Sequence, residues 1–138
     1  MPVTLTYVVV SVVSGLLFGI MDGFMNANPV ATRLYAIYKP IARTSINVPA
    51  GIGIDLAYGF LMAGIFLLLY RSLPGQTGLL KGISFGLLAW FFRVVMYVVS
   101  QWIMFTVPVP SLLYTAAAGL VEMLLLGMLY GLFLHPAA

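Results

Sequence analysis

The stretch from Gly86 to Gln101 reads Gly-Leu-Leu-Ala-Trp-Phe-Phe-Arg-Val-Val-Met-Tyr-Val-Val-Ser-Gln, with Arg93 in the middle of an apolar run. The run continues in both directions, over residues 79–105, and is longer than the roughly 20 residues with which an α-helix crosses a bilayer. A guanidinium group keeps its charge in such surroundings, so it requires a polar or acidic partner. The stretch therefore predicts a membrane-spanning helix that contacts another helix through a charged residue.

The composition of the whole chain supports the same class. Of the 138 residues, 63% are hydrophobic and 7% are charged, whereas soluble domains carry about 25% charged residues. The sequence predicts an all-α integral membrane protein, a four-transmembrane-helix bundle that forms one membrane domain over residues 1–138. The expected helices cover residues 5–25, 51–70, 79–105 and 111–134.

The connection between the first two predicted helices has its own pattern. Asn28 can cap a helix that begins with Pro29, and residues 29–39 mix apolar residues with Arg33 and two tyrosines. Tyrosine side chains favour the depth of the lipid headgroups. We expect a short amphipathic helix that lies in the membrane interface.

The location follows from hydropathy, but the orientation does not. We expect a multi-pass membrane protein of the bacterial inner membrane. Three basic residues lie in the first connection, and Arg71 and Lys81 lie on the other side with the amino terminus. Because positive charge is nearly balanced across the membrane, the sequence leaves the orientation open.

Glycines recur at intervals of four in the first and third predicted helices. Small residues at this spacing allow two membrane helices to approach closely, so we interpret these glycines as helix-packing positions. They are Gly15, Gly19 and Gly23 in the first helix and Gly82 and Gly86 in the third.

A shift of 67 positions places Gly15 on Gly82, Gly19 on Gly86 and Asp55 on Glu122. This correspondence predicts an internal repeat, in which two parallel helical hairpins arose by duplication.

Counting along the helices gives Arg93 a partner. Arg93 lies 12 residues before Phe105, and Glu122 lies 12 residues after Pro110. At ~1.5 Å per residue, both lie roughly 18 Å from the same side of the membrane. The sequence therefore predicts a buried Arg93–Glu122 ion pair.

The other two acidic residues lie closer to that side. Asp22 and Asp55 are each a few residues from it, and together with Asn26 they form a predicted shallow polar site. Two alternatives remain open for the charges. The Arg93–Glu122 pair fixes only the helix register, or the two aspartates are simply solvated near the headgroups.

Several kinds of chemistry are excluded by the residues present. The chain has no cysteine, and its one histidine, His135, lies at a predicted helix end. We expect no metal site, no cofactor and no Ser-His catalytic triad. Six basic residues in separate segments do not form a nucleic-acid-binding patch, so no nucleic acid is expected as a partner.

Three functions remain. The first is movement of an ion, proton or small solute, because acidic residues inside membrane helices commonly mark such paths. Four helices are few for enclosing a path, so this hypothesis includes a homo-oligomer in the lipid bilayer. The second is a non-catalytic accessory or scaffold subunit that binds other membrane subunits. The third is an intramembrane hydrolase in which Asp22 and Asp55 share a proton. No catalytic residue is assigned, and the sequence favours a protein without enzyme activity.

Overall fold

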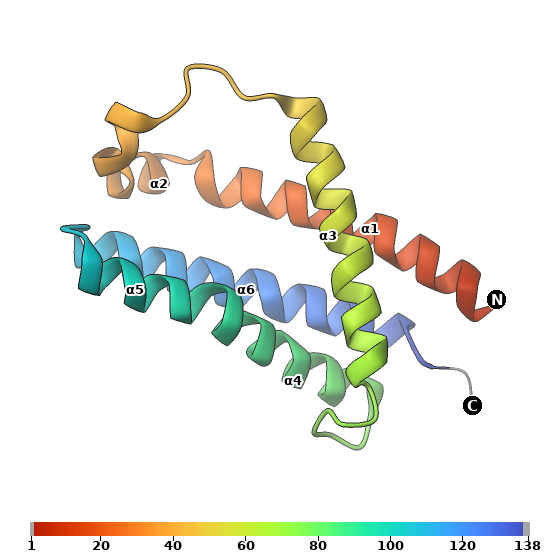
Figure 1. Ribbon diagram of the computed structural model, residues 1–138. Helices are drawn as coiled ribbons and strands as arrows, with labels where there is room; N and C mark the ends of the chain where they lie inside the picture. The colour runs from red at the N-terminus through yellow and green to blue at the C-terminus, as the bar shows by residue number, and fades with distance from the viewer. Residues whose placement is uncertain (1, 137–138) are drawn as a thin grey trace.

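The computed structural model describes residues 2–136, and every regular element in this part of the chain is helical (Figure 1). Four helices are long and apolar enough to cross a membrane, by length and composition. The predicted all-α class with four candidate spans is therefore confirmed. The spans are α1 (Val3–Asn26), α3 (Val48–Leu69), the continuous helix Gly78–Met104, and α6 (Val109–Phe133).

The third span is continuous but not uniform. It consists of α4 (Gly78–Trp90), the π-helical turn η2 (Phe91–Val95) and α5 (Met96–Met104). A π-helical turn holds one more residue than an α-helical turn, and such turns occur frequently at functional sites. Arg93 lies in this turn.

Side-chain caps determine where two of the spans begin. The Asn47 side chain accepts a hydrogen bond from the Ala50 amide, and Pro49 occupies the first turn of α3. The Thr77 hydroxyl accepts one from the Leu80 amide at the start of α4. These caps satisfy amide groups that have no partner within the helix. As a result α3 begins at Val48, three residues earlier than the apolar pattern indicates.

The first connection contains two short helical pieces, α2 (Pro29–Leu34) and the 3₁₀ helix η1 (Ala36–Ile41). The Asn28 side chain caps α2 by accepting a hydrogen bond from the Ala31 amide. Pro40 has no amide hydrogen to donate, so a regular α-helix cannot continue through it. The connection is therefore less regular than the single helix expected over residues 29–39.

Glycines bring α4 and α6 into backbone contact along their length. A Cβ atom built on Gly82 would lie 2.1 Å from the carbonyl oxygen of Gly127, and one on Gly78 would lie 2.4 Å from that of Gly131. No side chain fits between the helices at these positions. The second hairpin therefore consists of two helices that lie side by side (Figure 1).

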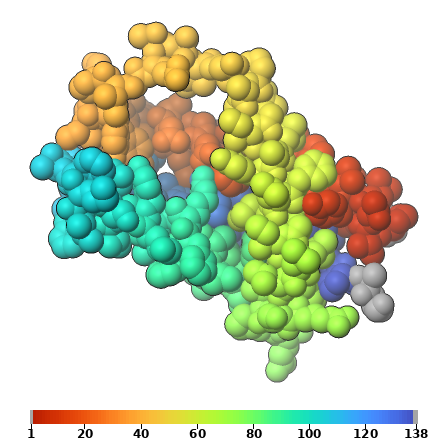
Figure 2. All heavy atoms as spheres, viewed as in Figure 1, coloured from red at the N-terminus to blue at the C-terminus, as the bar shows by residue number. Residues whose placement is uncertain are grey.

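Helices α1 and α3 meet over a shorter length, because α3 crosses α1 (Figure 1). A Cβ atom on Gly59 would lie 2.3 Å from the Ser11 carbonyl oxygen, and one on Gly15 would lie 2.8 Å from that of Asp55. Towards Val48 the helices diverge and leave an apolar cavity of about 580 Å³. Figure 2 shows the opening between the first connection and these helices.

The glycine contacts do not follow the predicted shift of 67 positions. Gly15 packs against α3 in the way that Gly86 packs against α6, and Gly86 lies 71 positions after Gly15. Gly59 packs against α1 in the way that Gly127 packs against α4, and Gly127 lies 68 positions after Gly59. The packing thus relates the hairpins by different shifts in their first and second helices, and it does not support the gap-free repeat.

Aromatic side chains join the two hairpins at the end away from the first connection. The Phe66 ring centroid lies 5.4 Å from that of Phe85 and 5.9 Å from that of Tyr130. Phe66 and Tyr130 are fully buried. The Tyr130 hydroxyl donates a hydrogen bond to Ser14 Oγ on α1 at 3.0 Å. This core fixes α1 against α6.

We expect Gly82→Ala to destabilise the protein and Gly53→Ala to leave it unchanged or slightly more stable. The added methyl at Gly82 would push α4 away from α6, and overpacking of this kind costs about 1–3 kcal/mol. A Cβ atom on Gly53 would meet no atom within 4 Å, so alanine there changes mainly the helix propensity. Thermal unfolding in a mild detergent measures both variants. Equal unfolding temperatures for the two variants would contradict the close contact.

Candidate functional site

A cavity of about 230 Å³ lies where α1, the first connection and the second hairpin meet. It contains two carboxyl groups, one guanidinium group, one carboxamide and three hydroxyl groups. The lining residues are Asp22, Met25, Asn26, Tyr35, Arg93, Val94, Tyr97, Thr115, Ala118, Gly119 and Glu122.

Glu122 is the most deeply buried acidic residue of the chain. Its side chain on α6 is 3% exposed, and its Oε1 atom is buried without a hydrogen-bond partner. One turn earlier, Gly119 leaves space for the Val94 side chain, since a Cβ atom there would lie 2.7 Å from Val94 Cγ2. The absence of a side chain at Gly119 therefore allows η2 to approach α6 beside Glu122.

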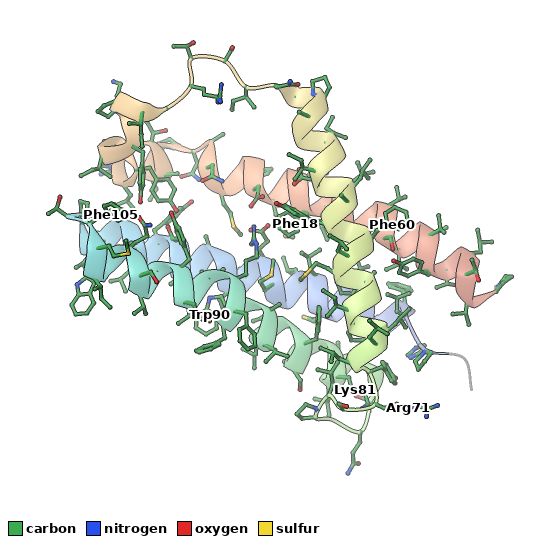
Figure 3. All side chains as sticks on the ribbon, viewed as in Figure 1. Phe18, Phe60, Arg71, Lys81, Trp90 and Phe105 are labelled. Carbon is green, nitrogen blue, oxygen red and sulfur yellow. The ribbon has the colours of Figure 1, made fainter. Side chains whose placement is uncertain are left out.

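Arg93 lies against an aromatic ring at the edge of the same cavity. Its Cζ atom is 4.5 Å from the centroid of the Phe18 ring, in a cation–π arrangement. Phe18 extends from α1 between that helix and the second hairpin (Figure 3). The guanidinium group otherwise remains exposed on the protein surface. Arg93 is thus held by α1 although it belongs to the other hairpin.

Asp22 and Asn26 bring polar groups to the cavity from the end of α1. The Asn26 Nδ2 atom donates a hydrogen bond to the Asp22 carbonyl oxygen at 2.8 Å. Asn26 is thereby held on its own helix. Its amide group and the Asp22 carboxyl group form the α1 wall of the cavity.

Tyrosines attach the first connection to α6 around the cavity. The hydroxyl groups of Tyr35 and Thr115 are 2.7 Å apart. The Tyr114 hydroxyl donates to the Met25 carbonyl oxygen and accepts from Asn28 Nδ2 at 3.0 Å. Burial raises the pKa of Tyr35 above its ordinary value, so its hydroxyl stays protonated at neutral pH. These contacts close one side of the cavity with neutral hydrogen-bonding groups.

The structure divides the predicted site residues between two cavities. Asp22, Asn26, Arg93 and Glu122 line one cavity. Asp55 lines the separate apolar cavity between α1 and α3, where its Oδ2 atom would lie 2.7 Å from a Cβ atom on Gly19. Equal depth would place Asp22 and Asp55 in one site if α1 and α3 were parallel. Instead α3 crosses α1, and Asp55 lies in the other cavity.

The predicted direct ion pair stays a prediction. Arg93 and Glu122 line the same cavity, as their equal depth indicates, but Arg93 lies on the Phe18 ring and Glu122 Oε1 has no hydrogen-bond partner. Among residues 2–136 no group of three histidine, aspartate or glutamate side chains is placed to hold a metal ion.

Sequence reasoning did not assign Tyr35, Tyr97 and Thr115 to the site. Tyr97 lies four residues after Arg93 and Thr115 lies seven residues before Glu122. Both spacings place the two side chains on the same face of a helix, so helical periodicity already indicated that Tyr97 lies beside Arg93 and Thr115 lies on the face of Glu122. The position of Tyr35 depends on how the first connection folds back onto α6, which no helical periodicity encodes.

The fold and the cavity together define a small multi-pass membrane protein with a charged cavity among its helices. Comparison with protein-family models, curated proteins and solved structures gives no match to this chain. The function is therefore inferred from the geometry of the cavity.

We expect the charges of Arg93 and Glu122 to be energetically coupled. Arg93 and Glu122 line the same cavity, so neutralising one of them removes an opposite charge close to the other, and Arg93→Gln and Glu122→Gln should not act additively. The change in the free energy of unfolding of the double variant should differ from the sum of the two single changes by about 0.5–3 kcal/mol.

Thermal unfolding in detergent of the two single variants and the double variant measures this coupling. Arg71→Gln combined with Glu122→Gln is the matched control and should be additive. Additivity in the Arg93 cycle would refute the pair.

Proposed function

We propose that this is a bacterial inner-membrane protein that moves protons, alone or together with a small solute, and that Glu122 is the group that binds and releases the proton. The observation that carries this proposal is the burial of Glu122, with an unpartnered carboxyl oxygen, in a cavity inside the membrane-spanning helices. Acidic residues in such positions are costly, and they commonly mark proton and ion paths.

The size and the lining of the cavity support this role. Its volume of about 230 Å³ is several times the roughly 30 Å³ that a water molecule occupies in the liquid. The cavity therefore has room for several waters or a small solute beside Glu122. The charged groups that line the cavity with Glu122 are Asp22 on α1 and Arg93 on η2, and the charge of Asp55 on α3 acts on Glu122 from outside the cavity. Each of these groups can stabilise one protonation state of Glu122 over the other.

Further polar groups continue along the contact between α1 and α6. Ser14 lies two turns from Asp22 on α1, and Tyr130 lies two turns from Glu122 on α6. Their hydroxyl groups form a buried hydrogen bond, and the neighbouring Ser11 Oγ is buried without a partner. Phe18 lies between the two polar layers and is 2% exposed. A path along this interface thus has two polar layers with one aromatic ring between them.

A homo-oligomer belongs to the proposal, because four helices enclose little space. The second candidate, an accessory subunit bound to other membrane proteins, stays a prediction. So does hydrolysis by Asp22 and Asp55, whose side chains line different cavities.

We expect proton flux through liposomes that contain the purified protein, and we expect Glu122→Gln to abolish most of it. Glutamine has nearly the shape of glutamate but cannot take up and release a proton. A pH-sensitive dye trapped inside the liposomes reports the flux when a potassium gradient with valinomycin sets the membrane potential.

Asp55→Asn is the matched control, because it also neutralises a membrane acid but outside the charged cavity. It should retain most of the wild-type flux, because the Asp55 carboxyl group does not line the cavity of Glu122. Wild-type flux no higher than that of protein-free liposomes would contradict uncoupled proton movement and leave only movement coupled to a solute. Unchanged flux for Glu122→Gln would contradict the role of Glu122.

A further inference from the structure

Two apolar cavities meet the charged cavity at Arg93. They have volumes of about 370 and 400 Å³ and share Met62 and Ile65 of α3. Phe92 lines one of them and Phe18 lines the other. We call this pair of cavities the α3–α4 groove. Arg93 lines both of its cavities and the charged cavity, so the groove and the charged cavity adjoin at this residue.

The groove follows from how the two hairpins separate. Helix α3 contacts the second hairpin through Phe66, at its carboxyl end, where the Phe85 and Tyr130 rings meet it. Before that point α3 crosses α1 (Figure 1), and the two cavities lie between α3 and residues of α1, α4 and η2. Because the side chains on both walls are apolar apart from Tyr58 and Arg93, a molecule dissolved in the membrane can enter between the hairpins.

The charge of the cavity selects the sign of the ligand. Its lining holds two carboxyl groups, Asp22 and Glu122, and one guanidinium group, Arg93. When Glu122 has released its proton and Asp22 and Arg93 are ionised, one negative charge is in excess. Glu122 Oε1 also lacks any hydrogen-bond donor. A positively charged donor satisfies both conditions, whereas an anion satisfies neither.

We propose that the charged cavity binds the ammonium group of a small amphiphilic organic cation, and that the apolar part of this cation lies in the α3–α4 groove. The inference rests on the proposed function, since it names the class of solute that the cavity takes. Arg93 is a specificity residue in this arrangement. Its guanidinium group lies on the Phe18 ring at the junction, where it competes with the ligand for the same carboxylates.

The probe is 2-phenylethylammonium, which joins an ammonium group to one aromatic ring. Two matched compounds isolate its parts: ethylammonium lacks the ring, and 3-phenylpropionate replaces the ammonium with a carboxylate. Titration calorimetry of the purified full chain in mild detergent measures the binding. We expect saturable binding of 2-phenylethylammonium, at least about tenfold weaker binding of ethylammonium, and no binding of 3-phenylpropionate.

Three variants test the assignment of residues. Glu122→Gln should weaken binding of 2-phenylethylammonium by about tenfold or more, because it removes a buried opposite charge. Ile65→Trp, which fills the groove, should weaken 2-phenylethylammonium but leave ethylammonium unchanged. Arg93→Gln should tighten both ammonium compounds. Arg71→Gln, at the far end of α3, is the control and should change neither. Size-exclusion profiles identify any variant that fails to fold.

The inference is overturned if 3-phenylpropionate binds in preference to 2-phenylethylammonium. It is also overturned if Arg93→Gln weakens ammonium binding, or if the folded Glu122→Gln variant binds as the wild type does. Failure of the inference is distinguishable from failure of the proposed function. Proton flux that depends on Glu122, together with no binding of 2-phenylethylammonium, refutes the organic cation and leaves the proposed function standing.

Discussion

The backbone contact between Gly82 and Gly127 is the constraint on which the rest of the structure depends. Lipid chains are as apolar as the side chains that face them, so membrane helices associate through close packing rather than through the exclusion of water. The glycine contacts fix α4 against α6 in one register. That register places Val94 on Gly119 and brings Arg93 and Glu122 to one cavity. The position of the charged groups in the cavity therefore depends on the glycines at the contact between α4 and α6.

No single helix supplies all the charged groups of the cavity. Asp22 comes from α1, Arg93 from the π-helical turn and Glu122 from α6. Arg93 is held by a ring of the opposite hairpin rather than by a carboxylate, and such a contact is weaker than a buried ion pair. In the proposed organic-cation site, the ligand would compete with Arg93 for the Asp22 and Glu122 carboxyl groups.

Hydropathy was sufficient to predict four spans, because about 20 consecutive apolar residues leave few other structures possible. Equal counts from the helix ends also indicated that Arg93 and Glu122 lie at one depth. The separation of Asp22 from Asp55 into different cavities was not predictable in this way, since helix crossing depends on which glycines face each other. The gap-free alignment paired Gly15 with Gly82, whereas the contacts pair it with Gly86. Tyr35 reaches the cavity through an irregular connection, for which the sequence carries no periodic signal.

The spans differ in length, and this couples the protein to the thickness of its membrane. The helix Gly78–Met104 has 27 residues and α3 has 22, so at ~1.5 Å per residue they measure roughly 40 and 33 Å. A hydrocarbon layer of about 30 Å accommodates the longer helix by tilting it more than the shorter one. In the structure α3 crosses the other long helices rather than running parallel to them (Figure 1). We expect a thicker bilayer to reduce the tilt of the longer helices and so to change the width of the α3–α4 groove beside Arg93. Lipid chain length would then act on access to the charged cavity without changing any residue.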